Sequence, residues 1–198
     1  MAEENLKKYG KVMEQYNDFV DQLEHGNAKY EQQLPALHKK FIAQLQEQGK
    51  LPPEVQSYAQ LSTEQRPLVD DLIDEHFAAI DPTIPLVFDS FKCLDLNVEL
   101  EKQLLKFWQP IFSNSTAFKR NGKLSPAEIS QVEQFRKKIR RQSVEHLNRI
   151  HANMLQIVRG CKDAELVAAA RSYLILHDRM VSMYTKSNII FVSDSNLL

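Results

Sequence analysis

The chain has little cysteine, glycine and proline. Of its 198 residues, two are cysteine, five are glycine and eight are proline. Cys93 and Cys161 stand far apart and form no Cys-x-x-Cys pair, which argues against a disulfide framework and against a zinc finger. Five scattered glycines cannot build a glycine-rich phosphate-binding loop. The scarcity of glycine and proline, beside abundant Leu, Gln, Glu, Lys and Ala, favours helix.

Long apolar segments are also missing. The longest apolar runs, such as Leu166–Ala170 and Ile189–Val192, have four or five residues, whereas a membrane-spanning helix needs about 20. The N-terminus is acidic at Glu3 and Glu4 and then amphipathic, so it does not resemble a signal peptide. We therefore expect a cytoplasmic protein that is not an integral membrane protein, and two unpaired cysteines fit a reducing compartment.

The common catalytic signatures do not occur. The chain has no Gly-x-Ser-x-Gly elbow and no His-Glu-x-x-His metal motif. The Glu-x-x-His pairs of di-iron bundles are missing as well, because glutamate never stands three positions before any of the six histidines. We expect a protein that is not an enzyme and that uses neither a metal nor a cofactor.

Apolar residues recur at helical spacing over most of the chain. This pattern predicts long amphipathic helices over about 3–48, 126–160 and 163–187, with shorter helices between them. Helices of this kind bury their apolar stripes against one another. We predict an all-α fold, an antiparallel helical bundle, as a single domain over residues 1–187 with a short C-terminal tail at 188–198.

The first of these helices carries a heptad-like stripe with one polar member. Its positions alternate in steps of three and four: Leu6, Tyr9, Met13, Tyr16, Val20, Leu23, Asn27, Tyr30, Leu34, Leu37 and Phe41. Such a stripe is typical of a coiled coil and could join two copies of the chain into a homo-oligomer through residues 6–41. Pro35 predicts a kink or short break near 26–35, and Gly49 predicts the end of the helix at about Gln48.

Local signals set the other boundaries. Ser125-Pro126-Ala127-Glu128 is typical of a helix start, with Ser125 as N-cap and Glu128 closing a capping box. Asp163 predicts the cap of the last helix.

The segment 85–118 is rich in Leu and Phe, and because Pro110 interrupts it we expect two short buried helices there. Its aromatic residues Phe107, Trp108 and Phe112 could line a small-ligand pocket, although such spacing is more typical of a core.

The net charge of −1 hides a strong polarity. Residues 1–100 hold 9 Lys+Arg and 18 Asp+Glu, whereas residues 101–198 hold 16 and 8. Either acidic and basic helices lie side by side and partly neutralise each other, or one surface is a basic face for an anionic partner.

Two charged runs are the candidate binding faces. The basic run has five cations in six residues: Arg136, Lys137, Lys138, Arg140 and Arg141. That density can neutralise phosphates or anionic lipid headgroups, although solvation or pairing with the acidic half of the chain also explains it. The acidic run is Asp70, Asp71, Asp74 and Glu75. Its members pair at a spacing of four and could chelate a cation, but we favour a solvated acidic face.

Three histidines could be ligands. His146 and His151 are five residues apart and therefore point in different directions around one helix, and His177 falls on the apolar stripe of the last helix. We favour hydrogen-bonded histidines in or near the core over metal or haem ligands.

These observations favour a non-enzymatic helical bundle that acts by protein–protein binding, as an adaptor, regulator, chaperone-like or toxin-neutralising protein. The expected partner is another protein. The alternative is binding of nucleic acid or an anionic membrane through the basic face around 136–141.

Overall fold

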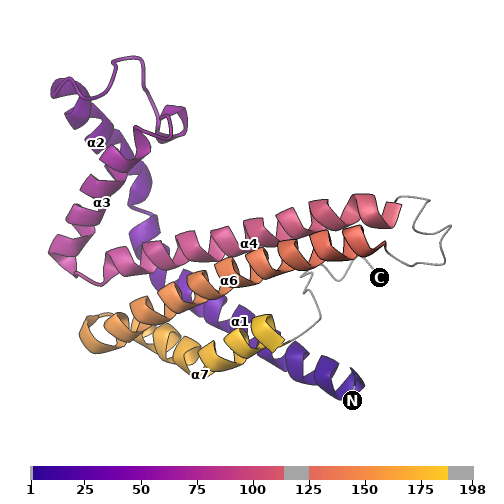
Figure 1. The fold of residues 1–198 in the computed structure, drawn as a ribbon. Helices are drawn as coiled ribbons and strands as arrows, with labels where there is room; N and C mark the ends of the chain where they lie inside the picture. Colours follow the sequence, from indigo (N-terminus) through magenta and orange to yellow (C-terminus); the bar gives the residue numbers. More distant parts are fainter. Residues whose placement is uncertain (1, 114–124, 187–198) are drawn as a thin grey trace. The chain divides into compact units, whose positions relative to one another are not determined.

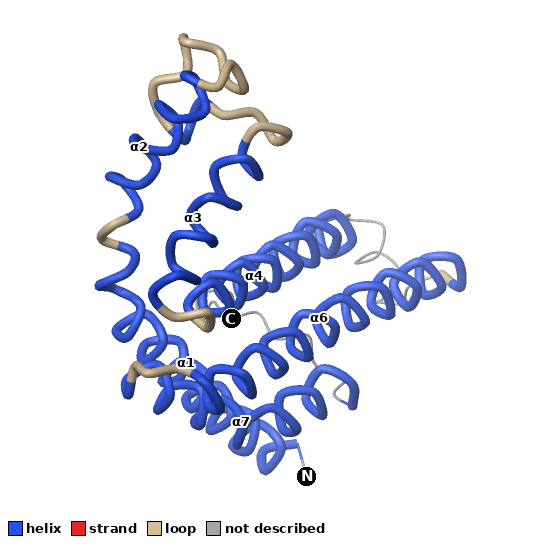
Figure 2. Tube along the Cα trace, turned by 90° about the vertical axis from the view of Figure 1, so that its left-hand side faces the viewer, coloured by secondary structure: helices blue, strands red, loops and turns tan. Residues whose placement is uncertain are grey.

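The computed structural model of the chain describes residues 2–113 and 125–186. Within these ranges the chain is helical and has no strand, which confirms the predicted all-α class (Figures 1 and 2). The elements are α1 (Ala2–Glu31), α2 (Leu34–Glu47), the 3-10 helix η1 (Tyr58–Gln60), α3 (Arg66–Ile80), α4 (Ile84–Ser113), α6 (Pro126–Gly160) and α7 (Ala164–Lys186). The predicted tail at 188–198 lies outside the described residues.

The predicted long N-terminal helix is present and is broken where proline requires it. The chain turns at Gln32 and Gln33, and α2 then begins with Pro35 in its first turn. Proline is tolerated there because the backbone N–H groups of a first turn have no acceptor within the helix. Gly49 adopts a φ of +69°, a conformation that glycine tolerates best. The backbone N–H of Lys50 closes the end of α2 by donating to the carbonyl of Leu45 at 2.8 Å.

The expectation of two short buried helices over 85–118 is wrong. Residues 85–113 belong to the single helix α4, which continues through Pro110 to Ser113, and residues 114–118 lie outside the described ranges. Proline in a helix removes one backbone hydrogen bond, and so late in the helix few turns remain to be disrupted. Nor is the segment wholly buried, because Leu96 and Val98 are each about half exposed.

The chain forms two compact units, each made of segments far apart in the sequence. Unit 1 comprises residues 1–13, 90–152 and 175–198, and unit 2 comprises 14–89 and 153–174. Helices α1, α4, α6 and α7 each contribute residues to both units. The single domain over 1–187 stays a prediction.

In unit 2, α1 and α7 pack antiparallel. The rings of Phe19 and Tyr173 lie 4.8 Å apart, and the hydroxyl of Ser172 donates to Gln22 at 3.0 Å. Four members of the predicted 6–41 stripe, Leu23, Asn27, Leu37 and Phe41, are buried. Phe19, which the stripe omits, is fully buried as well. These stripe residues therefore belong to the protein's own core.

In unit 1, α4 and α6 lie side by side and antiparallel (Figure 1). Asn97 hydrogen-bonds to His146 at 2.8 Å, and Phe107 stacks on Phe135 with ring centroids 4.3 Å apart. Buried aliphatic side chains from both helices form the core around these contacts: Leu100, Leu104, Val132, Ile139, Leu147 and Ile150.

Candidate interaction surfaces

The charge polarity of the sequence coincides with the two units. Counted over its sequence ranges, unit 1 holds 17 Lys+Arg and 10 Asp+Glu, a net charge of +7. Unit 2 holds 8 Lys+Arg and 16 Asp+Glu, a net charge of −8. The basic and acidic runs therefore belong to different units, and neither unit neutralises its own charge.

The basic run wraps around α6 instead of forming one face. Arg136 and Arg140 are half-buried and engaged by other residues of the protein. Lys137, Lys138 and Arg141 are exposed, and the Nε atom of Arg141 lies 3.6 Å from a carboxylate oxygen of Glu145. A continuous helix turns about 100° per residue, so six consecutive positions cover its whole circumference. The solvent-facing part of the run is Lys137, Lys138 and Arg141.

The acidic run on α3 is likewise divided. The hydroxyl of Tyr58 donates to half-buried Asp70 at 2.7 Å, and burial together with this hydrogen bond raises the pKa of Tyr58 to about 12. Asp74 is also half-buried and engaged, whereas Asp71 and Glu75 are exposed. Across the described ranges, no three His, Cys, Asp or Glu side chains gather closely enough to hold a metal ion.

The histidines are placed by packing that the sequence pattern does not reveal. In unit 1 the rings of His151 and His177 lie 4.1 Å apart, centroid to centroid, and His177 is buried. Burial and the neighbouring His151 lower the pKa of His177, and the opposing effect of Asp178 is smaller. His146 is held by Asn97, and burial lowers its pKa too. His177 is thus a core histidine and His146 is half-buried and hydrogen-bonded, whereas the buried Nδ1 atom of half-buried His151 has no hydrogen-bond partner among the described residues.

The aromatic pocket hypothesis rests largely on undescribed side chains. Phe107 stacks on Phe135 and is therefore part of the packing in unit 1. The side chains of Trp108 and Phe112 lie outside the described residues.

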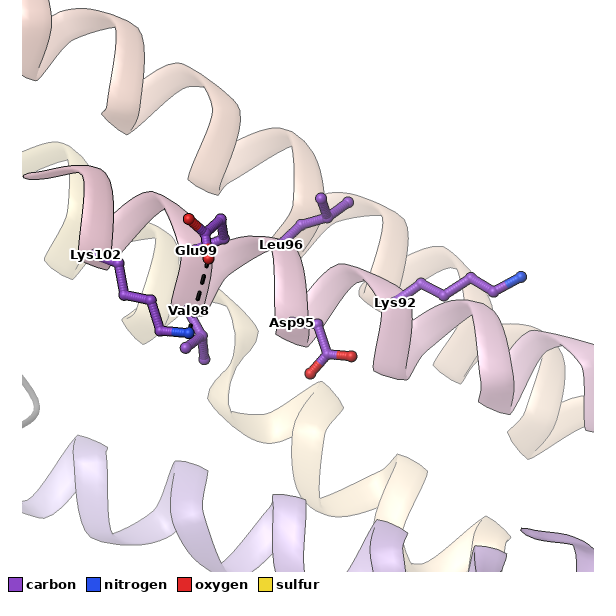
Figure 3. Close-up of a pocket in the computed structure, with 6 residues that line it drawn as sticks. All are labelled: Lys92, Asp95, Leu96, Val98, Glu99 and Lys102. Carbon is purple, nitrogen blue, oxygen red and sulfur yellow. Dashed lines mark ion pairs between the residues drawn. The ribbon is translucent and has the colours of Figure 1, made fainter. Parts of the chain in front are cut away.

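The outer face of α4 is a surface that was not among the candidates predicted from the sequence. A shallow depression on this helix is lined by six residues: Lys92, Asp95, Leu96, Val98, Glu99 and Lys102. Leu96 is 50% exposed and Val98 49%, and they project from opposite sides of the helix (Figure 3). Glu99 and Lys102 form an ion pair, with 3.7 Å between the carboxylate oxygen and the ammonium nitrogen. The alternation of charged positions at spacings of three and four could have signalled this face, but the abundance of leucine favoured a core interpretation.

Among the helices in the described ranges, none is both long and apolar enough to cross a membrane. Comparison with known proteins gives no significant match, whether to a protein-family model, to a curated protein or to a solved structure.

Proposed function

We propose that this protein acts in the cytoplasm by binding another protein and does not catalyse a reaction. The observation that carries the proposal is the outer face of α4, where two half-exposed aliphatic side chains border a charged surface. Exposed apolar side chains next to charged groups are a feature of many protein interaction sites.

The opposite charges of the two units support the same proposal. A unit with a net charge of +7 and a unit with a net charge of −8 each produce a field of one sign around themselves. Such fields accelerate encounter with an oppositely charged surface and repel unsuitable partners. An adaptor or regulator would gain speed and selectivity of association from this arrangement.

The test is native mass spectrometry of the tagged protein taken from its own cells after nuclease treatment. We expect a complex heavier than the 22.9 kDa chain. The double variant Leu96→Glu/Val98→Glu should lose the partner, because it replaces the two exposed aliphatic side chains that border the α4 face with charges. The matched control is Leu68→Glu/Ile80→Glu, at exposed aliphatic positions of unit 2, which should keep it. Wild type and both variants running as bare chains would contradict the proposal.

Binding of a polyanion is the second candidate, and the exposed cations Lys137, Lys138 and Arg141 favour it. Three phosphate contacts predict an affinity for duplex DNA that falls roughly 40-fold between about 50 and 200 mM salt. Changing all three residues to Gln should remove the binding. The matched control changes exposed Lys39, Lys40 and Lys50 of unit 2 to Gln and should keep the binding. Absent or salt-independent binding to DNA and to anionic vesicles would exclude this candidate.

A further inference from the structure

We propose that the outer face of α4 binds the same face of a second copy of this chain, with the two helices antiparallel. The inference rests on the proposed function of protein binding and names the partner. The observation behind it is the order of charges along the exposed side of the helix in unit 1.

Four charged residues form a single stripe on this side. Asp95, Glu99, Lys102 and Lys106 are all exposed and follow one another at spacings of four, three and four, which keeps them on one face of a helix. Between residues 95 and 106, the buried residues lie on the opposite side of α4: Asn97, Leu100 and Leu104. Read from the N-terminal end, the stripe is acidic, acidic, basic, basic, and one further exposed cation, Lys92, precedes it by three residues. We call it the α4 charge stripe.

This order is complementary to itself when one copy is reversed. A twofold axis midway between residues 100 and 101 places Asp95 opposite Lys106 of the other copy and Glu99 opposite Lys102. The symmetry repeats both pairs, so four attractive pairs form along the contact. A parallel, in-register pairing would instead oppose like charges at every position. The stripe therefore selects the antiparallel arrangement.

Ion pairs within a single copy of the chain compete only weakly with ion pairs between two copies. The ion pair between Glu99 and Lys102 within one helix is 3.7 Å long, and both side chains are more than half exposed. Exposed pairs of this kind contribute little to stability, so exchanging one for an intermolecular pair has a low cost. For Asp95 and Lys106 the structure gives no ion pair among the described residues. Leu96 and Val98 border the stripe and would be covered as the two helices meet.

The contact is short, which sets its strength. Asp95 and Lys106 are about 16.5 Å apart along the helix axis at 1.5 Å per residue. A pair of helices in contact over this length buries less than the roughly 800 Å² per partner of a standard stable interface. We therefore expect a weak, reversible dimer that salt weakens. The heptad stripe at 6–41 does not compete for this role without opening unit 2, because its central side chains are buried there.

The experiment uses complementary charge reversals in the full chain. Lys102→Glu/Lys106→Glu makes the stripe wholly acidic, and Asp95→Lys/Glu99→Lys makes it wholly basic. By sedimentation velocity at low salt, the wild type should dimerise as its concentration rises, and each variant alone should bind itself at least tenfold more weakly. An equimolar mixture of the two variants should recover the dimer, because acidic and basic stripes then face each other.

The matched control is Lys137→Glu/Lys138→Glu, which changes the net charge as much as the acidic variant does but on exposed positions of α6. It should dimerise like the wild type. The proposal is overturned if the wild type stays monomeric at every concentration, or if the mixture of variants fails to associate while circular dichroism shows both to be folded. A heavier complex from cells that contains only a different protein would also overturn it and would leave the proposed function standing.

Discussion

The phenol oxygen of Tyr30 on α1 lies 3.0 Å from a carboxylate oxygen of Asp163, the residue that caps the start of α7 in unit 2. The ammonium group of Lys29 lies 2.5 Å from the same oxygen, and the other carboxylate oxygen accepts the backbone N–H of Glu165. One carboxylate therefore serves as helix cap and as the contact that holds α1. Asp163 was predicted as a cap from the sequence alone, but its two partners on α1 were not.

Replacing Asp163 with Asn should reveal this double role. Burial would raise the pKa of Asp163, but hydrogen bonds from Lys29 and Tyr30 outweigh it and hold the pKa below its usual value. A carboxyl group with a lowered pKa stabilises the fold at pH values above its ordinary pKa and loses this contribution as the pH falls. Asn keeps the cap, so Asp163→Asn should lower the free energy of unfolding by about 1–3 kcal/mol at pH 7. Urea denaturation should show a smaller difference near pH 3, and an equal loss at both pH values would contradict the argument.

Two glycines of α1 should respond to alanine in opposite directions. A Cβ atom on Gly26 would meet the Cδ2 atom of buried Leu166 at 3.0 Å and the Cβ atom of Glu165 at 3.4 Å, whereas a Cβ on Gly10 meets nothing within 4 Å. Alanine favours helix over glycine by about 0.5–1 kcal/mol. Gly10→Ala should therefore raise the melting temperature, and Gly26→Ala should lower it because the clash exceeds the helix propensity gain. A higher melting temperature for Gly26→Ala would show that the side chain of Leu166 moves away from the added Cβ atom without a loss of stability.

Helix boundaries followed from local chemistry, which is why the sequence predicted them well. The capping box at Ser125 and the end at Gly160 place α6 at Pro126–Gly160. The outer face of α4 was not predicted, because burial depends on which neighbours a helix acquires and Pro110 suggested a break that does not occur. For the same reason the heptad pattern omitted Phe19, whose burial is decided by Tyr173 on a helix far along the chain.

The capping box makes its own prediction. The side chain of Glu128 accepts the backbone N–H of Ser125 at 2.6 Å, and the hydroxyl of Ser125 accepts the backbone N–H of Glu128 at 3.3 Å. Ser125→Ala should lower the free energy of unfolding by about 1 kcal/mol, because one N–H at the helix start loses its acceptor. Ser130→Ala, at an exposed position of the same helix, is the control and should have little effect on urea denaturation. Equal effects of the two changes would argue against the cap.

The fold should lose stability in mild acid. Burial and His151 lower the pKa of His177, so the unfolded chain binds the proton more readily than the folded one between the lowered value and the ordinary value of about 6.5. The contribution of neutral His177 is therefore complete above about pH 6.5 and is lost as the pH falls below it. Burial lowers the pKa of His38 and His146 as well, which adds to the same trend.

His177→Gln should reduce this pH dependence without abolishing it, because His38 and His146 remain. The measurement is the urea midpoint at about pH 7.5 and about pH 5.5, compared between wild type and variant. His25→Gln is the control, since the side chain of His25 is 81% exposed, and it should keep the wild-type dependence. If the urea midpoint of His177→Gln falls between the two pH values as much as that of the wild type, groups other than His177 cause the loss of stability in acid.

The interleaving of the two units along the chain has a consequence for synthesis. Unit 2 needs residues 153–174 to cover α1, and the hydrogen bond from Ser172 to Gln22 closes a separation of 150 residues. Neither unit can therefore finish folding while the C-terminal third of the chain is still inside the ribosome. Until then Phe19 and Leu23, which are fully buried in the finished protein, must remain in water or be shielded by a chaperone.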